Sequence, residues 1–125
     1  QVSGDCGADW IHGELVTATG RQQKRTILVD DQNVIVKDQV TGSAQAYLHL
    51  TPDYEYKEQD GQVLVKAVDG NVICRIIPEL SDQIKIHRDG EICSYAPEFG
   101  QIMKIQVLEI AWEGDGSEHE IQINW

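Results

Sequence analysis

Aromatic, sulfur-containing and basic side chains are scarce in this sequence. Of its 125 residues 6% are aromatic, and Met occurs once, Pro three times and Cys three times. Lys and Arg number 10 against 21 Asp and Glu, so the formal net charge is −11. Because nucleic acids and anionic membranes are themselves polyanions, this charge argues against both, and we expect no nucleic-acid and no membrane partner. The net charge does not exclude an anionic ligand that binds at a local basic patch.

Long apolar runs and a signal peptide are also missing. No stretch approaches the roughly 18 consecutive apolar residues that a membrane-spanning helix needs. The chain begins with Gln1, and no charged segment followed by an apolar one stands near its start. We expect residues 1–125 to form a single domain, either cut from a longer protein or present as a mature form.

Motifs for catalysis or cofactor binding are absent as well. No C-x-x-C pair is present, which argues against zinc-ribbon and thioredoxin sites, and neither G-x-S-x-G nor a phosphate-binding loop occurs. We therefore assign no catalytic residue and no metal ligand, and we expect no cofactor. The Asp-rich turns at 30–31 and 114–118 do not match the spacing of a calcium-binding loop. The histidines form no metal-binding pair and are predicted to lie on the polar faces of strands: His12, His49, His87 and His119.

Four Asp-Gly pairs punctuate the chain between short runs rich in Ile and Val, at 60–61, 69–70, 89–90 and 115–116. Asp and Gly tolerate the positive φ angles of tight hairpin turns, so this rhythm predicts antiparallel β-sheet. Strands are expected at residues 10–16, 24–30, 33–40, 44–50, 54–58, 62–68, 72–77, 83–87, 91–96, 101–112 and 119–125. Sheets with one apolar face bury each other about 10 Å apart. The predicted fold is an all-β antiparallel sandwich of about eleven short strands without substantial helix.

Two details of this pattern are more specific. The apolar parity of residues 101–112 changes near Val107, which predicts a bulge or a bend there. Cys74 and Cys93 lie in apolar segments and are interpreted as small core residues, with a disulfide between them as the alternative.

Two groups of residues are candidates for glycan binding. Arg21, Lys24 and Arg25 form the basic cluster of the chain and could meet a carboxylate or sulfate, with a solvated loop as the alternative. Tyr54 and Tyr56 share one face of a predicted strand and could stack on a sugar ring, with packing in the core or at a sheet edge as the alternative.

Three parts of the sequence carry a resemblance to a known family. They are the hairpin at 24–30 and 34–42 (KRTILVD and VIVKDQVTG), residues 46–56 (AYLHLTPDYEY) and residues 90–100 (GEICSYAPEFG). In motif, order and spacing, these parts resemble the C-terminal β domain of the heparinase II/III-like polysaccharide lyases, over roughly residues 12–125. One departure is Ala96, which stands before Pro97 where that family usually has Ser or a similar residue.

The resemblance implies a larger protein in which an α/α toroid precedes a layered β-sandwich. Enzymes of this family cleave uronate-containing glycans by β-elimination, and their catalytic Tyr and His and any metal ligands lie upstream of the segment present here. The resemblance thus implies an inactive C-terminal fragment that braces the toroid and lines part of the glycan cleft. It also implies an anionic polysaccharide as a partner and a periplasmic or extracellular location. A stand-alone carbohydrate-binding or adhesin-like β module and a structural sandwich without ligand are the alternatives.

Overall fold

The computed structural model describes residues 2–6, 10–16, 22–95, 100 and 102–125, and most of this part is antiparallel β-sheet. Its strands are β1 (Val2–Cys6), β2 (Trp10–Val16), β3 (Gln22–Val29), β4 (Asn33–His49), β5 (Tyr54–Gln59), β6 (Gln62–Ala67), β7 (Val72–Ile77), β8 (Gln83–His87), β9 (Ser94–Tyr95), β10 (Met103–Lys104) and β11 (Val107–Asn124). A single turn of 3₁₀ helix, η1 (Glu91–Cys93), precedes β9. Among the described residues, no helix is long and apolar enough to cross a membrane. The predicted all-β class is confirmed.

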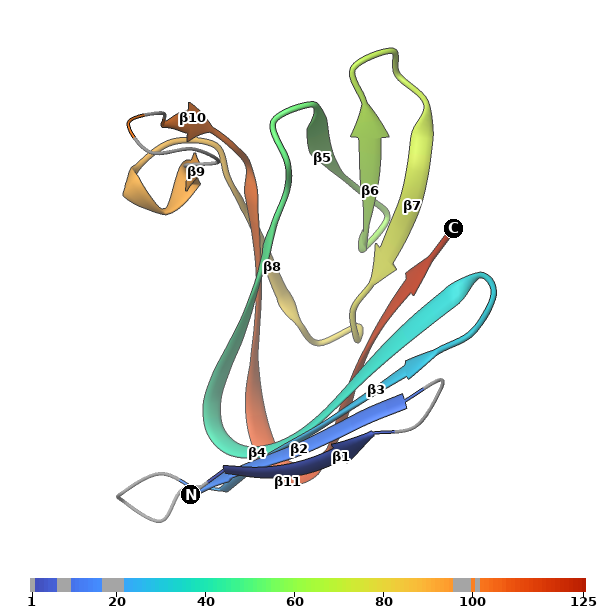
Figure 1. The fold of residues 1–125 in the computed structure, drawn as a ribbon, viewed down its shortest axis with the longest axis vertical. Coiled ribbons are helices and arrows are strands. Elements are labelled where there is room, and N and C mark those ends of the chain that lie inside the picture. The colour runs from blue at the N-terminus through green and yellow to red at the C-terminus, as the bar shows by residue number, and fades with distance from the viewer. Residues whose placement is uncertain (1, 7–9, 17–21, 96–99, 101) are drawn as a thin grey trace.

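Two long strands, β4 and β11, run through the whole fold. They pair antiparallel over almost their full lengths, and the register of this pairing shifts between Asp115 and Glu118. Figure 1 shows both ribbons bending sharply at the bottom of the view. Because of this bend, the two halves of the same strand pair belong to different layers.

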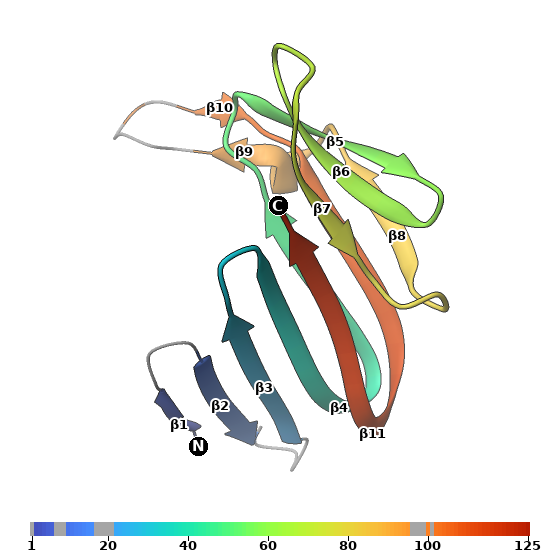
Figure 2. The ribbon, with the colours of Figure 1, turned by 90° about the vertical axis from the view of Figure 1, so that its right-hand side faces the viewer.

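The bend turns one continuous sheet into two facing layers. Figure 2 shows β1, β2, β3, β4 and β11 side by side, and the hydrogen-bonded order continues through β7, β6 and β5. The C-terminal end of β11 pairs with β7, whereas its N-terminal half pairs with β8 on the edge away from β4. The second layer thus consists of β8, the N-terminal half of β11 and the C-terminal half of β4. In Figure 1, β5, β6 and β7 stand on the right and face this layer on the left.

The main hydrophobic core lies between these layers. Its buried members come from β5, β6, β7 and β11: Tyr56, Val63, Val65, Ile76, Leu108, Ile110 and Ile121. Leu108 and Ile110 of β11 are both 0% exposed, because β11 is paired on both edges and covered by the opposite layer. The predicted sandwich, in which two apolar faces shield each other, is confirmed.

The turns predicted between residues 40 and 44 and at residues 115–116 are wrong, because these residues lie inside the two long strands. Residues 41–43 belong to β4 and residues 115–116 belong to β11. Gly42 and Gly116 adopt φ angles of 85° and 88°, so the backbone bends there without leaving the sheet. The prediction of short strands is therefore wrong for β4 and β11, which span 17 and 18 residues.

The strand predicted at 91–96 is also wrong over its described part. Gly90, with a φ of 99°, starts a tight turn in which the amide of Cys93 donates to the carbonyl of Gly90 at 3.1 Å. The chain therefore forms η1 and the two-residue β9 in place of a strand. The parity change near Val107 coincides with residues 105–106, which lie between β10 and β11.

The Asp-Gly signal holds where two short strands meet. Asp60 and Gly61, with φ angles of 53° and 76°, form the tight hairpin between β5 and β6. Positive φ at both central residues is the type I′ geometry, whose twist matches that of the flanking strands. This hairpin positions β5 at the edge of the sheet.

Cys74 and Cys93 are free thiols. Cys74 is partly buried against the main core, and this burial raises the pKa of its thiol. Cys93 is buried, and its Sγ donates to the carbonyl of His87 at 3.1 Å. Both behave as the small core residues that the sequence predicted, and the alternative of a disulfide between them is not realised.

Candidate functional site

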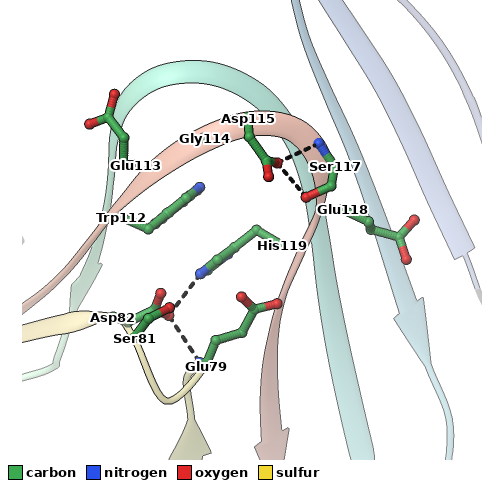
Figure 3. A pocket seen from close by; sticks show the side chains of 10 residues that line it. All are labelled: Glu79, Ser81, Asp82, Trp112, Glu113, Gly114, Asp115, Ser117, Glu118 and His119. Carbon is green, nitrogen blue, oxygen red and sulfur yellow. Dashed lines mark hydrogen bonds and ion pairs between the residues drawn. The ribbon is translucent and has the colours of Figure 1, made fainter.

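A pocket of about 370 Å³ opens where the bend of β11 meets the loop between β7 and β8. We call it the acidic pocket. It is lined by Glu79, Ser81, Asp82, Trp112, Glu113, Gly114, Asp115, Ser117, Glu118 and His119, which Figure 3 draws. Gly114 makes the bend possible, because a Cβ atom there would lie 2.1 Å from the carbonyl oxygen of Val40 on β4.

The bend brings two aromatic rings of β11 into contact. Trp112 and His119 stack with their centroids 3.8 Å apart and their planes within 2° of parallel. In a straight strand, residues seven apart would be separated by about 23 Å. The fold-back of β11 therefore creates this pair, and it leaves His119 only 5% exposed.

Asp82 fixes the His119 ring from the opposite side of the pocket. Asp82 Oδ2 lies 2.7 Å from His119 Nε2 and also accepts a hydrogen bond from the amide of Glu79 at 3.0 Å. The amide of Asp82 in turn donates to the carbonyl of Glu79, so the loop holds its own shape. The side chain of Asp82 is 0% exposed.

Glu79 completes the cluster at the mouth of the pocket. Its Oε1 accepts a hydrogen bond from the amide of Glu120 at 3.1 Å, which ties the loop to β11. Glu79, Asp82 and His119 each offer one ligand atom, and these atoms lie within 4.8 Å of one another. Two atoms of the cluster, Asp82 Oδ1 and His119 Nδ1, are buried without a hydrogen-bond partner in the described part of the chain.

The electrostatic potential in the acidic pocket is negative. Its lining contains five carboxylates, those of Glu79, Asp82, Glu113, Asp115 and Glu118, and neither Lys nor Arg. Hydrogen bonds from the side chain and amide of Ser117 lower the pKa of Asp115. Lys37 lies 3.4 Å from the carboxylate of Glu118 and offsets part of this charge. Such a pocket favours a cation and disfavours an anionic sugar.

A second pocket, of about 330 Å³, lies at the other end of the first half of β11. We call it the basic pocket. It is lined by Pro52, Tyr54, Arg88, Lys104, Ile105 and Gln106. Lys104 is paired with Asp89, and the hydrogen bond between them raises the pKa of Lys104 and lowers that of Asp89. Arg88 donates one hydrogen bond to the carbonyl of Tyr56 at 3.3 Å, and Tyr54 is 38% exposed.

Two solved structures of heparinase III share this fold. One aligns with a TM-score of 0.69 and 14% sequence identity, and covers 98% of this chain and 21% of that chain. The second, with methylated lysines, gives a TM-score of 0.67 and 16% identity with the same coverage. No family model and no curated protein matches the sequence.

The fold is that of a segment of heparinase III. At these identities the likeness concerns the fold alone, and the chain spans about a fifth of the length of the heparinase III chains. The resemblance that the sequence carries to the heparinase II/III-like β domain is therefore confirmed at the level of fold.

The predicted glycan-binding residues that the structure describes lie on two different strands, β3 and β5. Arg21 lies outside the described residues, and Lys24 and Arg25 are neighbours on β3, where successive side chains point to opposite faces. Arg25 donates from Nε and Nη2 to the buried carboxylate of Asp38, at 2.7 and 3.0 Å, and this bond raises the pKa of Arg25. The guanidinium fork is thus already engaged within the protein.

Tyr54 and Tyr56 lie on β5, which stands at the far end of the sheet order from β3. Tyr56 is 3% exposed, so its ring leaves no open face for a sugar. Tyr54 is the member of the pair that borders a pocket. Glycan binding stays a prediction, and on β5 the structure narrows it to Tyr54.

Reasoning from the sequence did not identify His119 as a candidate site residue. His49 is exposed at the end of β4, as predicted, but His119 is buried beneath Trp112, so the prediction of a surface position is wrong there. Its partner Asp82 lies 37 residues earlier in the chain. No local spacing signals this pair, because only the bend of β11 brings its members together.

Proposed function

We propose that this chain is a non-catalytic β-sandwich domain of a heparinase II/III-like polysaccharide lyase. One observation carries the proposal, namely that the fold matches along 98% of this chain but only 21% of heparinase III. In the proposed parent protein, an α/α toroid precedes this domain and cleaves a uronate-containing glycan by β-elimination. The sandwich braces that toroid and lines one wall of its cleft, in the periplasm or outside the cell.

The chemistry of the two pockets supports a role without catalysis. β-Elimination needs a base beside the sugar carboxylate and a positive or neutralised group that stabilises the developing charge. The acidic pocket contains His119 but surrounds it with carboxylates that repel a uronate. The basic pocket attracts a uronate through Arg88 and Lys104 but offers no carboxylate or imidazole in its lining. The imidazole and the cationic side chains thus line different pockets, and the phenol of Tyr54 is the group beside Arg88 and Lys104 that could exchange a proton.

A lyase assay on the isolated chain tests this role. With heparin, heparan sulfate or alginate as substrate, we expect no rise in ultraviolet absorbance from unsaturated uronate above the enzyme-free blank. A steady rise that scales with the concentration of the chain would refute a non-catalytic domain. The coding sequence upstream of Gln1 gives a second check, since we expect it to encode a helical toroid. That toroid, produced separately, should bind this chain when the two are mixed.

A stand-alone carbohydrate-binding module is the second candidate, and the basic pocket favours it. A sugar ring could stack on Tyr54 while its carboxylate meets Arg88 and Lys104. If the isolated chain binds an anionic oligosaccharide in calorimetry, Arg88→Ala and Tyr54→Ala should each weaken binding several-fold. Lys85→Ala, on the exposed face of β8, is the matched control and should not. Absence of measurable binding would leave the bracing role alone.

A further inference from the structure

We propose that Glu79, Asp82 and His119 form a binding site for a divalent transition-metal ion, and that Zn²⁺ is the ion that these donors fit best. The three ligand atoms lie within 4.8 Å of one another. Figure 3 shows the two carboxylates flanking the tip of the His119 ring, one on either side. The ligands come from the β7–β8 loop and from β11 beyond its bend, so they converge only in the folded chain.

The unpartnered carboxylate oxygen of Asp82 is an independent indication of a ligand. Asp82 Oδ1 and His119 Nδ1 are buried without partners, on side chains that are 0% and 6% exposed. Folded proteins rarely leave buried polar atoms unpaired, because each has lost its bonds to water. A cation held between the carboxylates and Nε2 of His119 compensates this loss at Asp82, whose Oδ1 has no donor among the described residues, whereas Nδ1 of His119 keeps the ring proton.

The surrounding charge favours the same ligand. Five carboxylates line the pocket, and Lys37 is paired with Glu118, one of these five. Asp82 is fully desolvated, so its negative charge needs a nearby positive charge more than that of a surface carboxylate. A divalent ion supplies that charge at the point where Asp82 and Glu79 approach each other.

The donor set selects the ion. One imidazole nitrogen and two carboxylate oxygens form a mixed set that suits zinc, which binds three protein ligands with a water in the fourth position. Calcium requires six to eight oxygen ligands, which this cluster does not provide. The ion would replace the hydrogen between Nε2 of His119 and Oδ2 of Asp82, and the ring proton would then sit on Nδ1. No oxidation or reduction is involved.

Such an ion would lock two parts of the fold together. The hydrogen bonds between Glu79 and Asp82 shape the β7–β8 loop, and the stacked Trp112 covers the His119 ring from above. An ion held by all three ligands would pin this loop to the bend of β11. We therefore expect binding to raise the thermal stability of the chain, in addition to any effect on a parent enzyme.

Calorimetric titration of the metal-free chain with ZnCl₂ tests the site. We expect one ion per chain, a rise in melting temperature on binding, and weaker binding of Ca²⁺. Asp82→Asn and His119→Gln remove one ligand each and should lower the affinity for Zn²⁺ by at least about tenfold. Loss of an outer-shell partner alone already lowers metal affinity by about tenfold or more, so loss of a direct ligand should cost at least as much. Glu113→Gln is the matched control, because it removes a carboxylate of the same pocket that is not a ligand, and it should leave Zn²⁺ affinity unchanged.

Glu79→Gln keeps the test decisive if the two buried substitutions prevent folding. Glu79 is exposed, so its amide should preserve the fold, as a circular dichroism spectrum can check. Weakened binding in this variant beside unchanged binding in Glu113→Gln supports the site. Equal affinities in Glu79→Gln and the parent chain, or no stoichiometric Zn²⁺ binding by the parent chain, would overturn it. None of these outcomes depends on the proposed lyase role.

Discussion

At the scale of single residues, Tyr56 shows how burial couples the core to pH. Its hydroxyl donates to the carbonyl of Leu48 at 2.8 Å, and the side chain is 3% exposed. Burial raises the pKa of its phenol well above the ordinary value of about 10, and the neighbouring Cys74 adds to this shift. The folded chain therefore holds this proton more tightly than the unfolded chain does. The resulting stability is fully present below about pH 10 and is lost as the pH rises further.

Tyr56→Phe should therefore change both the level and the pH dependence of stability. At neutral pH the variant loses the bond to Leu48, and its free energy of unfolding should fall by about 0.5–1.5 kcal/mol, the net contribution of one hydrogen bond. Above about pH 10 the free energy of the parent chain should fall more steeply than that of the variant, which has no phenol to ionise there. Urea titrations across this pH range measure both effects.

Tyr47→Phe is the control for the alkaline slope, since Tyr47 is 42% exposed on β4. It should fall in parallel with the parent chain. An equal slope in the parent chain and in Tyr56→Phe would show that the burial of this phenol does not govern alkaline stability.

At the scale of elements, the paired bends of β4 and β11 rest on two glycines that face each other in the ladder, Gly42 and Gly114. Gly42 has a positive φ of 85° and open space around it, whereas Gly114 is pressed against the backbone of Val40. Gly114→Ala must shift that backbone and should lower the free energy of unfolding by about 1–3 kcal/mol, as other overpacked sites do. Thermal or urea unfolding measures the change.

Gly42→Ala separates the effect of the steric clash from that of backbone strain, because it adds the same methyl group at a position without a clash. It should cost about 1–2 kcal/mol through the left-handed backbone alone. Gly114→Ala should also disturb the acidic pocket and shift the fluorescence of Trp112, which lies two residues away, whereas Gly42→Ala should do so less. A Gly114→Ala variant as stable as the parent chain would show that the bend tolerates a side chain.

The same glycine signal explains which elements could be predicted. Asp60-Gly61 and Asp115-Gly116 are identical pairs in sequence, and both glycines have positive φ. The first closes a hairpin, and the second bends a strand that continues. A positive φ serves either purpose, and the pairing of β11 with β4 on both sides of the bend decides between them. That pairing is long-range, so the local sequence predicted the strands but not their continuity.

At the scale of the whole molecule, the candidate metal site was beyond reach of the sequence for the same reason. Apolar alternation predicted the sandwich, because burial of strand faces is a local property of each segment. Glu79 and Asp82 stand in an ordinary polar loop, and His119 follows an Asp-Gly pair that looked like a hairpin turn. Their convergence depends on the bend, on the close approach at Gly114 and on the loop that spans β7 and β8.

The whole fold also predicts an uneven distribution of stability. β3 and β11 are both paired on two edges, but β11 has five buried residues and β3 has none. The amide of Ile110 in β11 should therefore exchange with solvent deuterium only when the entire chain unfolds, whereas the amide of Ile27 in β3 should exchange through a smaller local opening. Hydrogen exchange followed by nuclear magnetic resonance in low urea, without added metal, distinguishes the two. Ile110 should show a steep dependence on urea and Ile27 a shallow one, and equal protection of both amides would mean that the β3 side unfolds together with the core.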